Sequence, residues 1–332
     1  MLAAALPADA PPSDVSAALS HLLTNDFRFS TSDLADLGKG EVVAHRLGAT
    51  AYGEAGAVGA VRIAGRKETF VDLYRNIEQF KRGPGVMSIG MFGNPPSVAD
   101  LASLMVNLRD MNLRECRVGD CDVRLPASDI ERIRREVDWN APDADARAFT
   151  LFKEIFAGYV RDYVAGDPNK LVQYDDDPRP VRPQDDFSAL VEHSPYLDRL
   201  APGLSRHFEA YPKHPLPDVE DFVYWSVERF GRLAPFISAT HVAITQPEPS
   251  TVVIASKDVY SSRYFDASLS FTIAADAVSL PGSFYLVYAN RSRADALKGS
   301  LAGLRRSIVE RRSKGSIEDH LKAMKQQLEK GS

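Results

Sequence analysis

The chain has 332 residues, of which 44% are hydrophobic and 26% are charged, and its formal net charge is -5. This composition is that of an ordinary globular protein with one large domain or two small ones. A mildly acidic chain lacks the concentrated basic face that nucleic-acid binding requires, so no nucleic-acid partner is expected. No apolar stretch approaches the roughly 20 residues of a membrane-spanning helix, so no integral membrane segment is expected.

The first twelve residues form a leader rich in alanine and proline that contains a cleavage-like Ala-Asp-Ala triplet. The segment is too short and lacks the basic start of a complete signal peptide. Two interpretations stay open: residues 1–12 are the remnant of a signal peptide, or they are a leader without regular structure.

Cys116 and Cys121 are the only cysteines, in the segment Cys116-Arg-Val-Gly-Asp-Cys121. Two cysteines cannot hold a structural zinc ion by themselves, and the spacing is not that of a Cys-x-x-Cys redox motif. Gly119-Asp120 is a turn signal that brings the two sulfur atoms within bridging distance. A disulfide is therefore favoured over two reduced thiols. Since a disulfide implies an oxidising compartment, we expect an exported or periplasmic protein, with a cytoplasmic location as the alternative.

Residues 13–127 predict helices and strands in alternation. Short helices are expected at 13–25 and 32–37, and a hairpin is expected from strands at 41–47 and 57–63. An amphipathic helix follows at 66–82, where Phe70, Tyr74, Ile77 and Phe80 recur at helical spacing. A strand at 86–92 and a helix that begins at Ser97 complete this part.

Residues 128–230 change in character and predict a block of helices without strands. Ser128 and Glu131 have the spacing of a capping box, and the apolar residues of 146–165 recur at helical spacing. Further helices are expected at 185–210 and 217–230. We interpret the block as a large helical insertion.

Residues 235–330 predict an antiparallel meander followed by a long helix. Strands are expected at 236–245, 251–260, 264–274 and 283–290, and the short turns between them require antiparallel pairing. The C-terminal helix is expected to be interrupted at Gly315. One face of the third strand is apolar, and we expect the C-terminal helix to cover it and to leave a concave apolar space. That face consists of Phe265, Ala267, Leu269, Phe271 and Ile273.

This order of elements resembles the helix-grip fold of the START and polyketide-cyclase-like superfamily. The likeness rests on Ala57-Val-Gly-Ala-Val-Arg-Ile63 with the helix after it, and on Tyr285-Leu-Val-Tyr-Ala-Asn290 leading into the last helix. It implies an α+β fold in which a curved antiparallel sheet grips a long C-terminal helix around an apolar cavity. Segments 13–127 and 235–330 would then form one domain. The competing interpretation is a small N-terminal unit and a separate C-terminal sheet.

Several residues of the predicted strands are candidates for chemistry or binding. His241 lies within a strand and has the side chain of an acid or base, although a structural histidine is the favoured interpretation. Tyr264 and Asp266 lie one step apart on a strand face and form a second weak catalytic candidate, with an outward polar face as the alternative. Arg291 has the donors to bind a carboxylate or phosphate group. The expected ligand contacts are Tyr224, Trp225, His241, Tyr264, Tyr288 and Arg291.

No spacing in the sequence is typical of a metal site, because the histidines are scattered along the chain. We therefore expect no metal and no cofactor. The leading hypothesis is a binding or transport protein that holds a hydrophobic small molecule or lipid between the sheet and the C-terminal helix. The alternatives are a cyclase- or hydratase-type enzyme on the same scaffold, or a protein-interaction module with a filled core.

Overall fold

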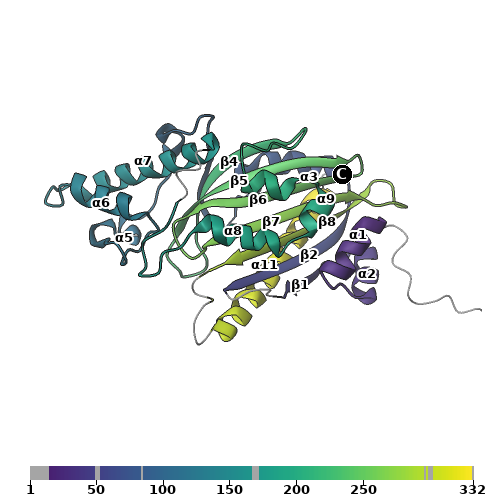
Figure 1. The fold of residues 1–332 in the computed structure, drawn as a ribbon. Helices are drawn as coiled ribbons and strands as arrows, with labels where there is room; N and C mark the ends of the chain where they lie inside the picture. The colour runs from purple at the N-terminus through teal and green to yellow at the C-terminus, as the bar shows by residue number, and fades with distance from the viewer. Residues whose placement is uncertain are drawn as a thin grey trace, which may run out of the picture.

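The computed structural model describes residues 15–48, 53–83, 85–166, 172–294, 297 and 302–330, and the side chains of 302–312 are outside this description. The fold is α+β, as predicted. It is built on one antiparallel sheet of eight strands with helices on both faces (Figure 1). The leader at residues 1–12 lies outside the described residues.

The sheet joins the N-terminal hairpin to the C-terminal meander. Its strand order is β1-β2-β8-β7-β6-β5-β4-β3, with every neighbouring pair antiparallel. The predicted hairpin and the four predicted meander strands are confirmed. The strands are β1 (Val43–Leu47), β2 (Glu54–Ala64), β3 (Val86–Met91), β4 (Glu220–Glu228), β5 (Phe236–Glu248), β6 (Thr251–Ser261), β7 (Ala267–Asp276) and β8 (Ser283–Arg293).

One face of the sheet is covered by α3 (Lys67–Arg75), α4 (Ile77–Phe80) and the long helix α11 (Ala302–Lys330). Ile317 and Leu321 of α11 lie directly over Gly59 of β2, where an added Cβ atom would stand 2.5 Å and 2.7 Å from them. A glycine is therefore needed for the helix to approach the strand this closely. Helix α11 is continuous through Gly315, so the predicted interruption is wrong: a single glycine lowers helix propensity by about 1 kcal/mol, and Ile317 and Leu321 on its C-terminal side pack on the sheet.

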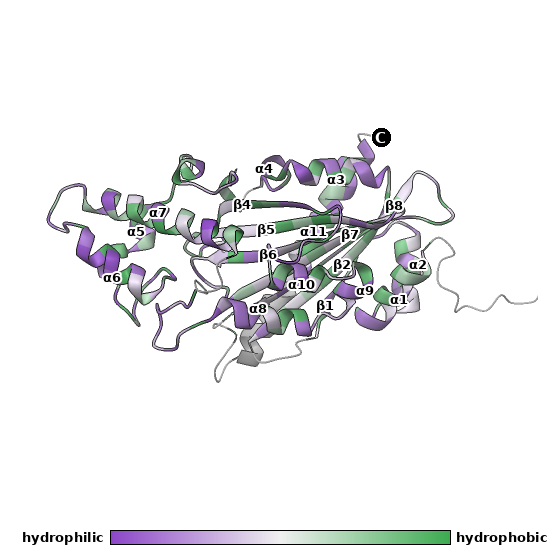
Figure 2. Cartoon of the chain, turned by 45° about the horizontal axis from the view of Figure 1, so that its top comes forward, coloured by the Kyte–Doolittle hydropathy of each residue, from purple (hydrophilic) through white to green (hydrophobic). Residues whose placement is uncertain are grey.

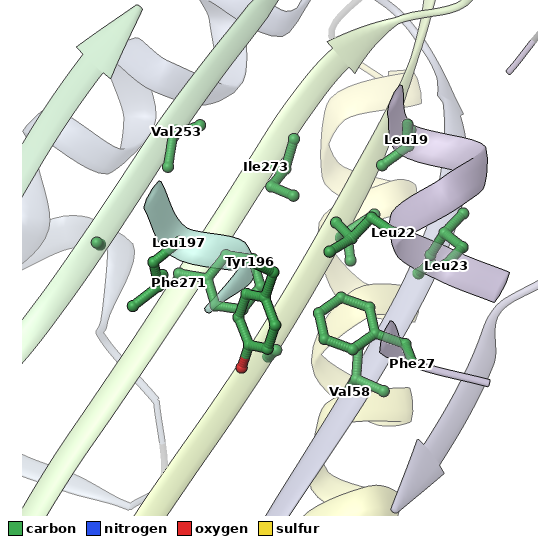
Figure 3. Packing of buried hydrophobic residues seen from close by; sticks show 14 of the residues in the cluster. Leu19, Leu22, Leu23, Phe27, Val58, Tyr196, Leu197, Val253, Phe271 and Ile273 are labelled. Carbon is green, nitrogen blue, oxygen red and sulfur yellow. The ribbon is translucent and has the colours of Figure 1, made fainter. Parts of the chain in front are cut away.

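The other face is covered by the N-terminal helices and by part of the predicted helical block. The covering helices are α1 (Ala17–His21), η1 (Leu22–Asp26), α2 (Thr31–Gly38), α8 (Pro183–Glu192), α9 (Tyr196–Leu200) and α10 (Leu204–Glu209). Leu269, Phe271 and Ile273 of β7 point into this layer, where Phe271 packs against Phe27 and Tyr196 (Figure 3). The prediction that α11 covers this face of β7 is wrong, because α11 packs on the opposite face.

A third group of helices packs against the end of β3–β6 and extends away from the rest of the sheet (Figures 1 and 2). It consists of η2 (Val98–Leu101), α5 (Leu108–Met111), η3 (Leu113–Glu115), α6 (Ala127–Glu136) and α7 (Ala144–Ala165). We call this group the helical end. Cys116 and Cys121 form a disulfide within it, with their Cα atoms 4.3 Å apart. Across the described ranges, no helix combines the length and the apolar character needed to cross a bilayer.

Two predicted helices are absent from the described chain. Residues 217–230 contain strand β4, so the block 128–230 is not wholly helical; every residue of Phe222–Trp225 is apolar, and such a run does not distinguish a buried strand from a helix. The expected helix after Ser97 is only the short turn η2. The capping box of Ser97 and Asp100 is present, but the helix ends at Leu101.

Candidate functional site

His241 lies in the middle of β5, and its side chain is fully buried against residues of α7 and α10. The neighbouring strand β4 places Val223 directly opposite His241. Asp221 is two residues before Val223 and so lies on the same face of the sheet. The sheet therefore presents a carboxylate and an imidazole side by side.

Helix α10 adds a second histidine to this pair. The Nε2 atoms of His207 and His241 each lie 2.9 Å from the same atom, Asp221 Oδ1. His207 is fully buried, whereas the Asp221 side chain keeps 18% of its surface exposed. The three residues form what we call the His–Asp–His centre, which is closed on the sheet side and open to solvent at the carboxylate.

The other ring nitrogen of each histidine also has a partner. Nδ1 of His207 lies 3.0 Å from the main-chain carbonyl oxygen of His214, to which it donates. Nδ1 of His241 lies 2.8 Å from the hydroxyl of Tyr163, which comes from the end of α7. Both rings are therefore fixed in orientation, with their Nε2 atoms directed at Asp221.

The protonation of the centre follows from these contacts. Burial is the largest single influence on His207 and opposes its charged form, but the hydrogen bond and charge of Asp221 and the carbonyl of His214 together outweigh it, so the pKa of His207 is raised. Burial prevails at His241 and lowers its pKa despite the same carboxylate. Burial alone would raise the pKa of Asp221, yet its hydrogen bonds with the two histidines lower it. At neutral pH the centre combines a carboxylate, a neutral His241 and a His207 that is more basic than usual.

Lys257 of β6 lies directly across from His241 in the strand pairing, and its side chain is 5% exposed or less. Its ammonium donates to Gln184 Oε1 at 2.8 Å and to the carbonyl of Phe208 at 3.2 Å. Both acceptors are neutral, and burial lowers the pKa of Lys257 to about 7. An amine that titrates near neutrality is a common feature of catalytic sites.

The other predicted catalytic residues have structural partners outside this centre. Asp266 is buried and forms an ion pair with Arg124, whose Nη2 lies 2.7 Å from Oδ1. The hydroxyl of Tyr264 donates to the carbonyl of Ala234 at 2.8 Å. The structure thus places His241 beside Asp221 and His207, whereas Tyr264 and Asp266 have other polar partners.

The predicted ligand contacts are distributed over both faces of the sheet. Arg291 does bind a carboxylate, but it is the buried Glu54 of the same chain. Trp225 is fully buried and donates to the carbonyl of Asp100 at 2.9 Å. Tyr224 and Tyr288 lie on the face of α11, opposite His241. These residues do not converge on a single site.

The face of α11 carries a hydrogen-bonded polar row across β4–β8. Lys81 donates to Glu228 at 2.7 Å and to Tyr224 at 3.2 Å, and Thr240 donates to Asp258 at 2.9 Å. Burial raises the pKa of Asp258 to about 6, although the hydrogen bond from Thr240 lowers it. The sheet face that α11 covers is therefore polar at Glu228, Thr240 and Asp258, where an apolar surface was expected.

Replacement of Asp258 by asparagine is expected to stabilise the protein at alkaline pH. The folded-state pKa exceeds the ordinary value of 3.8, so the cost of ionising Asp258 is absent below that pH and complete above about 6. We expect a gain of about 1–2 kcal/mol near pH 8, allowing for partial exposure, and none below pH 4. Urea unfolding across this pH range measures it, with Asp319→Asn on the exposed face of α11 as the control. An equal gain at both ends of the range would contradict the prediction.

Comparison with known proteins finds no matching family model, no matching curated protein and no matching solved structure. The assignment of a site therefore rests on geometry. The sequence pointed to His241 but not to His207, Asp221 or Tyr163, which are far from it in the chain. The expectation that the histidines are scattered does not hold in three dimensions, since His207 and His241 meet at Asp221.

Proposed function

We propose that this protein binds a divalent transition-metal ion, with zinc as the first candidate, at His207, Asp221 and His241. The observation that carries the proposal is the convergence of three ligand atoms of different chain segments, which all lie within 4.8 Å of one another. Two histidines and one carboxylate are a common ligand set for zinc and for non-haem iron.

The spacing of the ligand atoms supports this proposal. Zinc lies about 2.0–2.2 Å from imidazole nitrogen and carboxylate oxygen, so neighbouring ligand atoms around it are roughly 3.0–3.5 Å apart. The two distances of 2.9 Å to Asp221 Oδ1 are just below this range. A metal ion would replace the protons between these atoms, and the third pair of ligand atoms, the two Nε2 atoms, lies within 4.8 Å.

The contacts of the distal ring nitrogens support it independently. A histidine that binds a metal usually donates its other N–H to a carbonyl, a carboxylate or water, which orients the ring. The carbonyl of His214 has this position at His207, and the Tyr163 hydroxyl has it at His241. The same two contacts would also orient the histidines in a purely structural hydrogen-bond network. A measurement of metal binding distinguishes a metal site from such a network.

Three protein ligands leave coordination positions for water, which is the arrangement of catalytic zinc sites. Bound zinc would lower the pKa of a water molecule toward neutrality, and the reaction class that follows is metal-assisted hydrolysis or hydration. Asp221 lies on the exposed side of the centre, where a substrate would enter. Lys257 and Tyr163 are the nearby groups suited to hold or transfer a proton.

Titration of metal-free protein with Zn²⁺ tests the proposal. Wild-type protein is expected to bind one equivalent, and zinc at 100 times its Kd should add about 2.7 kcal/mol to the free energy of unfolding. The variants Asp221→Asn and His241→Gln should lose this stabilisation. Co²⁺ gives a second readout through its visible absorption, which reports the ligand set directly.

The matched control is His214→Ala, because His214 contributes only its main-chain carbonyl to His207. This variant removes a nearby exposed imidazole and should bind zinc as wild-type does. Wild-type protein without saturable binding, or Asp221→Asn with unchanged affinity, would show that the centre is only structural.

A second candidate function is the binding of a hydrophobic small molecule or lipid between the sheet and α11, in a helix-grip arrangement. The disulfide is compatible with an exported carrier. A ligand on this face would have to be amphipathic, because Ile317, Leu321, Met324 and Leu328 form an apolar contact with the sheet and the polar row of Lys81, Glu228 and Asp258 lies on the same face.

Native mass spectrometry of purified protein, followed by solvent extraction, measures whether such a ligand copurifies. We expect an amphipathic molecule with a polar head in a one-to-one complex. Protein that is ligand-free and gains no stability from any added lipid would exclude this function without affecting the metal proposal.

A further inference from the structure

The helical end carries a surface cleft with a volume of about 430 Å³. Its lining residues come from η3, the disulfide loop, α6 and the segment after α6. Figure 1 shows α6 in the part of the helical end that extends away from the sheet. We call it the arginine cleft. Its lining is formed by Arg114, Arg117, Arg134 and Arg135, with Trp139 and two glutamates, Glu115 and Glu131.

The arginine cleft gathers four arginines in an acidic protein. Its lining has four arginines and two glutamates, a formal charge of +2, whereas the whole chain has -5. Three of the arginines are partly neutralised by exposed ion pairs: Arg134 with Glu131 at 3.0 Å, Arg135 with Glu136 at 3.1 Å and Arg114 with Asp145 at 3.5 Å. Arg117 instead donates to the carbonyls of Arg114 and Cys116, which neutralise no charge.

The guanidinium groups of Arg114 and Arg117 are held in place before any ligand binds. The disulfide between Cys116 and Cys121 closes the loop that carries Arg117, and Cys116 itself is buried. Arg114 donates to the carbonyl of Trp139 at 2.7 Å and lies 5.2 Å from the centre of its ring. Arginine side chains fixed in this way lose little entropy when they bind the oxygens of a phosphate group.

Two apolar residues accompany the arginines, one next to a lining residue in the chain and one in the lining itself. Val118 follows Arg117 in the disulfide loop and is 48% exposed. Trp139 is half-buried and lines the cleft. Basic residues beside an exposed valine and a tryptophan are suited to the boundary between lipid headgroups and acyl chains.

We propose that the arginine cleft binds the phosphate of an anionic phospholipid headgroup and docks the helical end on a membrane surface. Arg117 and Arg134 contact the phosphate, and Val118 enters the acyl boundary. A free phosphate compound and an acidic polysaccharide are the competing occupants. The proposal does not depend on the metal centre, which lies under α10 on the sheet.

Cosedimentation of the full chain with vesicles tests the proposal. We expect binding to vesicles in which about a third of the lipid is phosphatidylglycerol, and none to pure phosphatidylcholine. The double variant Arg117→Gln/Arg134→Gln should bind anionic vesicles about 30-fold more weakly, since each arginine contributes about 1 kcal/mol near an anionic surface. Val118→Asp should weaken binding further, while thermal unfolding confirms that each variant folds.

The matched control is Arg66→Gln/Arg199→Gln, which removes the same charge from exposed positions outside the helical end. It should bind as wild-type does; equal weakening in both double variants would mean diffuse attraction and overturn the proposal. Inorganic phosphate and a soluble polyuronate are added in separate arms. The proposal would also be overturned if inorganic phosphate or the polyuronate bound at the cleft while the protein did not bind anionic vesicles.

Discussion

Replacement of Glu54 by leucine is expected to lower the free energy of unfolding by about 3–5 kcal/mol, because it leaves a buried guanidinium without its counter-ion. Glu54 is fully buried at the start of β2 and accepts from Arg291 on the neighbouring strand β8. Nδ1 of His193 lies 2.8 Å from its other oxygen. Urea unfolding at neutral pH measures the loss.

The chain offers a control with the same chemistry at the surface. Glu220 pairs with Arg75 at 2.8 Å, and both side chains are almost half exposed. Glu220→Leu should therefore cost less than about 1 kcal/mol. The double variant Glu54→Leu/Arg291→Met should recover much of the loss, because both charges are then removed. Equal effects at Glu54 and Glu220 would contradict the prediction.

The strands of the meander could be predicted because local signals agreed. Each of β5–β8 combines β-branched and aromatic residues with short polar turns, and these signals act within a few residues of one another. Strand β4 could not be predicted in this way, because Phe222–Trp225 contains no polar residue and so lacks the alternation of apolar and polar positions that is typical of a strand. Both of its faces are buried, by the helical end on one side and by the α11 layer on the other.

Which helix covers which face could not be predicted from periodicity. The apolar face of β7 fits any amphipathic helix, and α11 was the nearest in sequence. In the structure the N-terminal helices α1 and η1 reach this face together with α9, although they are far from β7 in the chain (Figure 3). The pairing of β2 with β8 joins the N-terminal hairpin to the β8 edge of the meander.

The candidate site, like the fold, could be predicted only in part from the sequence. His241 was recognisable because a histidine inside an apolar strand needs a polar partner. Its partners were not recognisable, since Asp221 fell within a predicted helix and His207 lies on α10. Only the register of β4 against β5 places the carboxylate beside the ring. Arg291 was predicted to bind the carboxylate or phosphate of a ligand, and in the structure it pairs with the internal carboxylate of Glu54.

Replacement of Asp266 by alanine is expected to lower the free energy of unfolding by about 3–5 kcal/mol, as at Glu54. The sequence had made Asp266 a weak catalytic candidate. Arg124 would lose its buried ion-pair partner while its Nη1 still donates to the carbonyl of Phe265. The pair links the helical end to the start of β7, so its loss should expose this junction first. Hydrogen exchange of residues 122–126 and 262–268 locates the opening, and urea unfolding gives its free energy.

A double-mutant cycle separates the ion pair from other effects of truncation. Arg124→Met alone leaves the carboxylate of Asp266 buried, and Arg124→Met/Asp266→Ala removes both charges. If the pair is the cause, the double variant is more stable than the sum of the two single losses predicts, by about 1–3 kcal/mol. Zinc binding should persist in all three variants, because Asp266 lies outside the His–Asp–His centre. A loss of zinc binding in folded Asp266→Ala would instead return Asp266 to the functional site.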